Sequence, residues 1–183
     1  MNIVIGTPLY PPEMFGPAPY SKELARRLAA RGHEVSVVTY GRLPESVPGV
    51  KTIVVSKREA LPTRIIRYLL SLKKTVKNDS ILYIQNGPSV ELPALIVSLI
   101  KRKKIIIGIS DTNAHTLAQK NKILSIIESA TRSRTQAILS DIPPHKPEIF
   151  PLEDYPKQQM DAYETAWKKH LAALENIFKK YGK

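Results

Sequence analysis

Residues 1–39 of the chain read MNIVIGTPLYPPEMFGPAPYSKELARRLAARGHEVSVVT, and this segment indicates the fold class most clearly. It contains an apolar run predicted as a strand over about 2–5, a proline-rich loop, a helical pattern over 18–31 and a second apolar run over 35–39. This order is typical of the opening unit of a nucleotide-binding type of parallel sheet. Because such sheets bind ligands at the carboxyl ends of their strands, the proline-rich loop is a candidate binding segment.

Four more apolar runs follow and alternate with helical patterns. Strands are predicted at about 51–56, 80–85, 104–110 and 136–140, and helices near 60–77, 89–102 and 117–132. Most of these strands are continuous runs of Val, Ile and Leu, as expected for strands buried on both faces of a sheet. The sequence therefore predicts an α/β fold: a Rossmann-like, doubly wound parallel sheet of about six strands, with helices on both faces, over residues 1–141.

The composition changes after residue 141. The segment 142–156 holds five of the 15 prolines, which predicts an extended Pro-rich linker over 142–155. Beyond it, apolar residues recur every three or four positions from Met160 to Tyr181, a pattern typical of a long amphipathic helix. We expect this C-terminal helix, within 156–183, to bury its apolar face against the same domain.

The charge and composition narrow the classes of partner. The net charge is +12, which suits nucleic acid, anionic lipid or sugar-phosphate ligands, or serves solubility alone. The chain has no Cys, so thiolate metal sites are excluded, and we expect neither a metal nor a cofactor. No zinc-finger, helix-turn-helix or RNA-binding aromatic motif is present, so nucleic acid is not an expected partner. The short apolar runs predict a cytoplasmic protein, with peripheral attachment to a membrane surface as an alternative.

The segment TPLYPPEMFGPAPYSKELARRLAARGHEVSVVT resembles the start of family 4-like glycosyltransferases of the GT-B fold. Those enzymes open with a strand, a T-x-YPP…GG loop, a helix and an RGHEV-V-T strand. Here Phe15 stands where the family often has the first of two glycines. Complete GT-B enzymes have two domains, so the resemblance implies the N-terminal, acceptor-binding domain without the domain that binds the nucleotide sugar. The C-terminal helix is similar to the helix that returns to the first domain in that family.

The resemblance implies that the chain is half of a split sugar-transferring enzyme. It would bind a glycan or lipid-linked acceptor, and a separate donor-domain chain would bring the nucleotide sugar. Gly16, at the junction of loop and helix, would then contact the donor diphosphate, since helix N-termini attract anions; alternatively, it only starts the helix. A non-catalytic binding or regulatory module, or a small independent enzyme, are the other hypotheses.

Polar residues that follow predicted strands are the candidate site residues. Asp111 follows the fifth strand and is a candidate catalytic base, or else the N-cap of the next helix. His115 would share a helix face with it, on the acceptor side or simply in solvent. Gln85 and Asn86 end the fourth strand, where we expect them to hydrogen-bond the acceptor's hydroxyls.

The predicted helix over 60–77 is basic and amphipathic. Its basic residues Arg64, Arg67, Lys73 and Lys74 lie mostly opposite the apolar side. On an anionic membrane surface each such residue contributes about 1 kcal/mol of binding free energy. The alternative is a helix that packs on the core and exposes a solvated basic face.

Overall fold

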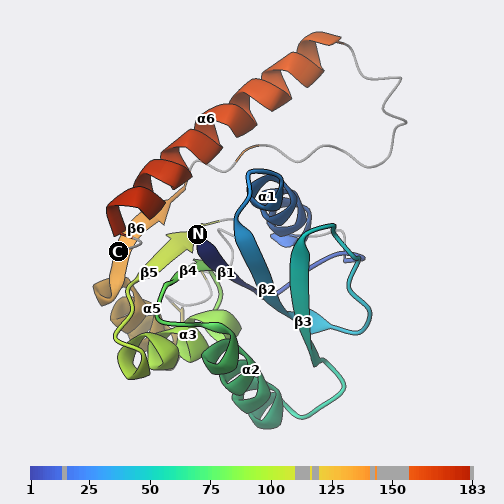
Figure 1. Cartoon of the computed structure of the whole chain (residues 1–183). Coiled ribbons are helices and arrows are strands. Elements are labelled where there is room, and N and C mark those ends of the chain that lie inside the picture. The colour runs from blue at the N-terminus through green and yellow to red at the C-terminus, as the bar shows by residue number, and fades with distance from the viewer. Residues whose placement is uncertain (14–15, 110–115, 117–119, 141–142, 144–156, 182–183) are drawn as a thin grey trace.

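The computed structural model describes residues 1–13, 16–109, 116, 120–140, 143 and 157–181. In this part of the chain, one sheet contains six strands (Figure 1). They are β1 (Asn2–Thr7), β2 (Glu34–Gly41), β3 (Val50–Ser56), β4 (Ser80–Gln85), β5 (Ile105–Gly108) and β6 (Thr135–Leu139). All neighbours pair in parallel, in the order β3-β2-β1-β4-β5-β6. This is the order of a doubly wound Rossmann-type sheet, so the predicted fold class is confirmed.

Five helices with described bounds cover the sheet. They are α1 (Ala18–Ala30), α2 (Leu61–Thr75), α3 (Pro88–Ile100), α5 (Lys122–Ser133) and α6 (Lys157–Tyr181). Hydrogen bonds and backbone conformation determine where some of these helices begin or end. The α1 helix stops because Gly32 takes a φ of 80°, and the Gly32 and His33 N–H groups donate to carbonyls of its last turn. The α5 helix begins at the side chain of Asn121, which accepts from the N–H groups of Ile123 and Leu124.

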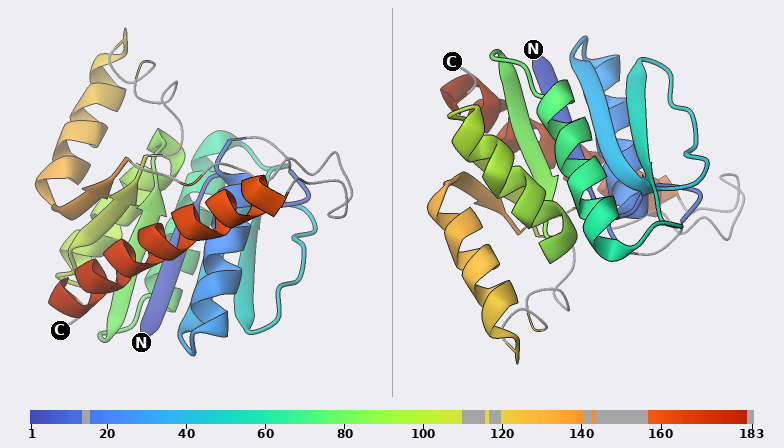
Figure 2. Two further views of the ribbon diagram at one scale, coloured as in Figure 1. Left: turned by 90° about the horizontal axis from the view of Figure 1, so that it is seen from above. Right: turned by 90° about the horizontal axis from the view of Figure 1, so that it is seen from below.

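The helices form one layer on each face of the sheet. Helices α2, α3 and α5 cover one face, and α1 and α6 cover the other (Figure 2). Alternate strand residues point into the two cores: Ile3 and Ile5 pack under α1 and α6, whereas Val4 packs under α2 and α3. The two layers bury the central strands completely, as their continuous apolar runs predict.

The long C-terminal helix lies across α1 and the sheet. Its residues Trp167, Leu171, Leu174 and Phe178 are almost fully buried in the same cluster as the β1 residues Ile3 and Ile5. The Trp167 ring stacks on the ring of Tyr20 from α1, with centroids 5.5 Å apart. Figure 2 shows α6 running obliquely over this face.

Polar contacts fix α6 in this position. The Tyr20 hydroxyl lies 2.8 Å from His170 Nε2 and 2.8 Å from the Tyr83 hydroxyl of β4. Arg27 of α1 donates to the Glu164 carboxylate at 2.6 Å and 2.9 Å. Burial raises the pKa of Tyr20, so its hydroxyl remains a neutral hydrogen-bonding group. The network therefore links α1, β4 and α6 into one unit.

Candidate functional site

The strand order changes direction between β1 and β4, and the carboxyl ends of these strands are where doubly wound sheets bind ligands. The loop after β1 is tied back to α1 at this point. Thr7 Oγ1 donates to the Leu9 carbonyl at 2.8 Å and accepts from Ser21 Oγ of α1 at 3.1 Å. After β4, Gly87 takes a φ of 143°, which favours glycine, and brings its backbone close to Pro8. The two loops therefore meet at the switch point.

A pocket of about 410 Å³ opens beside the switch point, at the carboxyl ends of β1, β2 and β3. We call it the β1–β3 pocket. It lies between the proline-rich loop after β1 and the residues that end β2 and follow it. Its walls include Tyr10, Pro11, Pro12, Tyr40, Leu43 and Val54, and its polar groups include Glu13, Arg42 and Lys57. Two loops that are distant in sequence thus build one largely apolar hollow.

The β1–β3 pocket combines neutral tyrosines with cations. Burial, and secondarily the charge of Glu45, raises the pKa of Tyr10 to about 12. Burial also raises the pKa of Tyr40, whose hydroxyl donates to the Ser89 carbonyl at 2.8 Å. Lys57 forms an ion pair with Glu13, whereas Arg42 is exposed and has no ion pair among the described residues. The pocket therefore suits a ligand with an apolar body and an anionic group.

One further cation, Arg64, flanks this pocket. The Arg64 guanidinium, at the start of α2, lies 5.6 Å from the centroid of the Tyr40 ring. This contact is within the range of a cation–π interaction, and it places a positive charge at the pocket's aromatic wall. Of the four basic residues predicted for a membrane surface, Arg64 is thus oriented toward the ring of Tyr40.

A second, smaller pocket of about 90 Å³ lies at the carboxyl ends of β4, β5 and β6. Asn86 lines it together with Glu91, Glu128 and Arg132. Glu91 Oε1 accepts the Gly87 N–H at 3.0 Å, so this carboxylate holds the turn that starts α3. Arg132 donates to Glu128 at 2.5 Å. The pocket is small, and its charged residues Glu91 and Arg132 already form hydrogen bonds within the protein.

The predicted site residues are not all brought together. Asn86 reaches the second pocket, but Gln85 is fully buried and its Nε2 donates to the Tyr83 hydroxyl at 3.2 Å. Gln85 is therefore not exposed in an open crevice, contrary to the expectation that it hydrogen-bonds the acceptor's hydroxyls. The reason is Gly108 on the neighbouring strand: it has no side chain, and the Tyr83 and Gln85 groups occupy the space a Cβ would fill. Asp111 and His115 lie outside the described residues.

Gly16 is exposed in the loop that leads to α1. It takes a φ of 59°, a conformation that favours glycine. Pro17 occupies the N-cap position and α1 begins at Ala18, so Gly16 precedes the cap rather than forming it. An anion that approached the start of α1 would meet this residue at the carboxyl edge of the sheet.

Within the described ranges, no three His, Asp or Glu side chains are placed to hold a metal ion. No protein-family model matches this chain, and a search of curated proteins gives no significant match. Tyr40, Arg42 and Lys57 were not predicted as site residues. In the structure Arg42 directly follows β2, but the predicted strand ended at residue 39, so Arg42 did not stand out as a strand-end residue.

Proposed function

We propose that this chain is the acceptor-binding domain of a family 4-like glycosyltransferase, and that a separate donor-domain chain supplies the nucleotide sugar. The observation that carries the proposal is the β1–β3 pocket. The TPLYPP segment, which carries the family resemblance, forms part of its wall at the carboxyl edge of the sheet. A ligand seated there would lie next to the switch point and next to the loop that contains Gly16.

Each part of the edge has a role in this proposal. The acceptor's apolar body packs against Tyr10 and Tyr40, and Arg42 holds its anionic group. Gly16 lets the donor diphosphate approach the start of α1. Asp111, which follows β5 in sequence, accepts the proton of the acceptor hydroxyl as its oxygen bonds to the anomeric carbon of the sugar and the nucleoside diphosphate leaves. The donor domain would close over this edge and position the activated sugar.

The first prediction concerns the acceptor. We expect the purified chain to bind farnesyl phosphate, which has an apolar body and an anionic group, more tightly than farnesol. Arg42→Gln should weaken farnesyl phosphate binding about fivefold in isothermal titration calorimetry, because an exposed ion pair contributes up to about 1 kcal/mol. Arg58→Gln, an exposed arginine that does not line the pocket, is the matched control and should change nothing.

The purified chain also tests whether a separate donor-domain chain is needed for sugar transfer. We expect no sugar transfer from UDP- or GDP-sugars to any acceptor by this chain alone, since the donor domain is a separate chain in this proposal. Turnover by the isolated chain would overturn the split-enzyme proposal and favour the independent enzyme. Equal affinities for farnesol and farnesyl phosphate would contradict the anionic acceptor. A binding or regulatory module would bind the probe but support no transfer with any donor domain.

A second proposal is that the α2 side of the molecule attaches to an anionic membrane surface. Of the ten large apolar side chains exposed in the described ranges, seven lie on α2, α3 and α5, which cover one face of the sheet. On α2, Ile66 and Leu70 are 55% and 57% exposed, one to two turns before the exposed Lys73 and Lys74. Arg67 is exposed but pairs with Glu59 at 2.6 Å. None of the described helices has both the length and the apolar character to cross a bilayer.

A vesicle-binding experiment distinguishes attachment through this face from a general effect of the protein's net charge. Replacing Lys73 and Lys74 by Glu should weaken binding to phosphatidylserine-containing vesicles by at least about 30-fold, at about 1 kcal/mol for each lysine lost, and the added carboxylates are also repelled by the surface. Lys168→Glu with Lys169→Glu on α6, on the other face of the sheet, makes the same change in net charge and should have a much smaller effect. Sedimentation at two salt concentrations measures both. Equal binding to neutral and anionic vesicles would rule out electrostatic attachment.

A further inference from the structure

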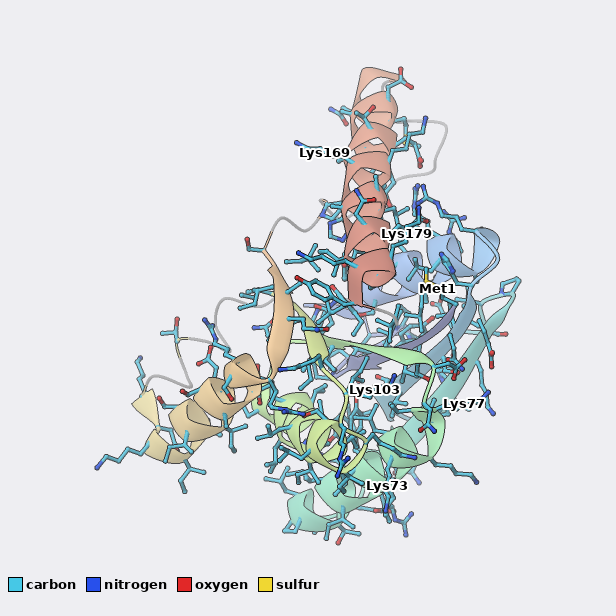
Figure 3. The ribbon with its side chains drawn as sticks, turned by 60° about the vertical axis from the view of Figure 1, so that its left-hand side comes forward. Met1, Lys73, Lys77, Lys103, Lys169 and Lys179 are labelled. Carbon is cyan, nitrogen blue, oxygen red and sulfur yellow. The ribbon has the colours of Figure 1, made fainter. Side chains whose placement is uncertain are left out.

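The amino edge of the sheet, opposite the candidate site, collects basic residues from three helix ends. Figure 3 labels Lys73, Lys77, Lys103 and Lys179 on this side of the molecule. The full set lies in and just after the last turn of α2, between α3 and β5, and in the last turn of α6: Lys73, Lys74, Lys77, Lys101, Arg102, Lys103, Lys104, Lys179 and Lys180. Two acidic residues also lie here: Glu34 at the start of β2, to which Lys77 donates at 3.3 Å, and the exposed Asp79 directly before β4. The edge is therefore strongly positive.

Stabilisation of helix C-termini explains only part of this charge. The C-terminus of a helix carries about half a negative charge, and nearby Lys or Arg side chains stabilise it. All five described helices, α1 and α5 included, end at this edge and together supply about 2.5 negative charges. Nine basic residues exceed that several times over. The surplus positive charge must be solvated, or it must have another partner.

A small pocket lies in the middle of this surface. It has a volume of about 160 Å³, and its polar lining consists of Ser80, Arg102, Lys103, Lys104, Gln136 and Tyr181. We call it the amino-edge pocket. In the described part of the chain, no carboxylate forms an ion pair with any of its three cations. Typical pockets for whole small-molecule ligands are larger, about 300 Å³ or more, so this one suits a single compact group.

Arg102 occupies a backbone position where helices usually place glycine. Its φ is 53°, and it is the one described residue other than glycine with a positive φ. The turn is a helix C-terminal cap: the Lys101 N–H donates to the Val97 carbonyl at 2.8 Å, and the Lys103 N–H donates to the Ser98 carbonyl at 2.9 Å. A left-handed arginine is unfavourable relative to glycine. The backbone thus does not explain why an arginine is here, whereas a ligand for its guanidinium would.

We propose that the amino-edge pocket binds a phosphoryl group, with Arg102 as its main contact and Lys103 and Lys104 as supporting cations. Guanidinium groups bind phosphate oxygens in a bidentate fashion, and the amide of Gln136 and the hydroxyl of Tyr181 can complete the shell. The group belongs to a small phosphate ester in solution or to a lipid headgroup. The site is separate from the β1–β3 pocket, which lies at the opposite edge of the same sheet.

The test uses Arg102→Gly, which removes the guanidinium but suits the backbone. We expect the full chain to bind pyrophosphate in calorimetry, or vesicles that contain phosphatidic acid but not phosphatidylcholine vesicles. Arg102→Gly should weaken that binding about tenfold, as expected for the loss of a charge-assisted hydrogen-bonding pair. The midpoint of thermal unfolding should not fall, because glycine adopts a positive φ readily. Lys169→Gln, on the exposed side of α6, is the matched loss of one charge.

The two probes identify the source of the phosphate. Pyrophosphate binding that Arg102→Gly weakens supports a soluble phosphate ester. Binding only to phosphatidic acid vesicles, again weakened by Arg102→Gly, supports a headgroup. Absence of saturable binding to both probes, or equal affinities of the wild-type, Arg102→Gly and Lys169→Gln proteins, would overturn the proposal. Arg42 and Arg102 line pockets at opposite edges of the sheet, so Arg42→Gln and Arg102→Gly test the two proposals separately.

Discussion

Replacing Trp167 by alanine should lower the free energy of unfolding by about 3–5 kcal/mol, the usual range for losing a buried Trp or Phe from a core. Trp167 is only 1% exposed. Its ring stacks on Tyr20 and lies 5.1 Å from the Arg27 guanidinium, so it joins α6 to α1. Its removal leaves a cavity between the helices and also removes these aromatic and cation–π contacts. The effect should therefore reach the upper part of the range.

Urea unfolding followed by circular dichroism measures this change. Fluorescence is unsuitable, because Trp167 is the single Trp in the chain. Lys168→Ala is the matched control: it lies next to Trp167 on the exposed side of α6 and should change stability by less than about 0.5 kcal/mol. If Trp167→Ala also changed the free energy of unfolding by less than 0.5 kcal/mol, α6 would not be a stabilising part of the domain.

The sequence predicted the layered arrangement of strands and helices because buried elements have a recognisable spacing of apolar residues. The runs around Ile5 and Ile106 are continuous, and both strands are buried on their two faces. The apolar spacing in the last helix placed Trp167 and Leu171 on one face, and both are buried there. The strand order also follows general rules, since short right-handed crossovers leave few alternatives.

The candidate site was harder to predict, because its residues meet only in three dimensions. Tyr10 and Arg42 are distant in sequence, and both line the β1–β3 pocket. Tyr10 belongs to the TPLYPP segment, but Arg42 belongs to no recognised motif. Gln85 was correctly placed at the end of a strand, but its burial depends on the missing side chain of Gly108 on the next strand. A left-handed conformation at Arg102 could not be predicted either, because helix caps of this kind usually contain glycine or asparagine.

Replacing Gly108 by alanine should be among the most destabilising substitutions at a glycine of this chain. A Cβ at this position would overlap the Tyr83 hydroxyl and lie 2.8 Å from Cζ of the same ring. Tyr83 cannot move aside easily, because it is fully buried and its hydroxyl contacts Tyr20 at 2.8 Å. Overpacking a core costs about 1–3 kcal/mol and occasionally more, and we expect a loss of about 3 kcal/mol in urea unfolding.

Two comparisons test the cause of this effect. Gly41 also ends a strand of the same sheet, but the nearest atom to its added Cβ would be 3.8 Å away, so Gly41→Ala should cost less than about 1 kcal/mol. Tyr83→Phe removes the overlapping oxygen, so the Gly108→Ala and Tyr83→Phe double variant should be more stable than Gly108→Ala alone. The rescue should be partial, because the Cζ contact remains and the hydrogen bond with Tyr20 is lost. Equal losses at Gly41 and Gly108, or strictly additive effects of the two substitutions, would show that the close approach of Tyr83 to β5 is not what requires glycine there.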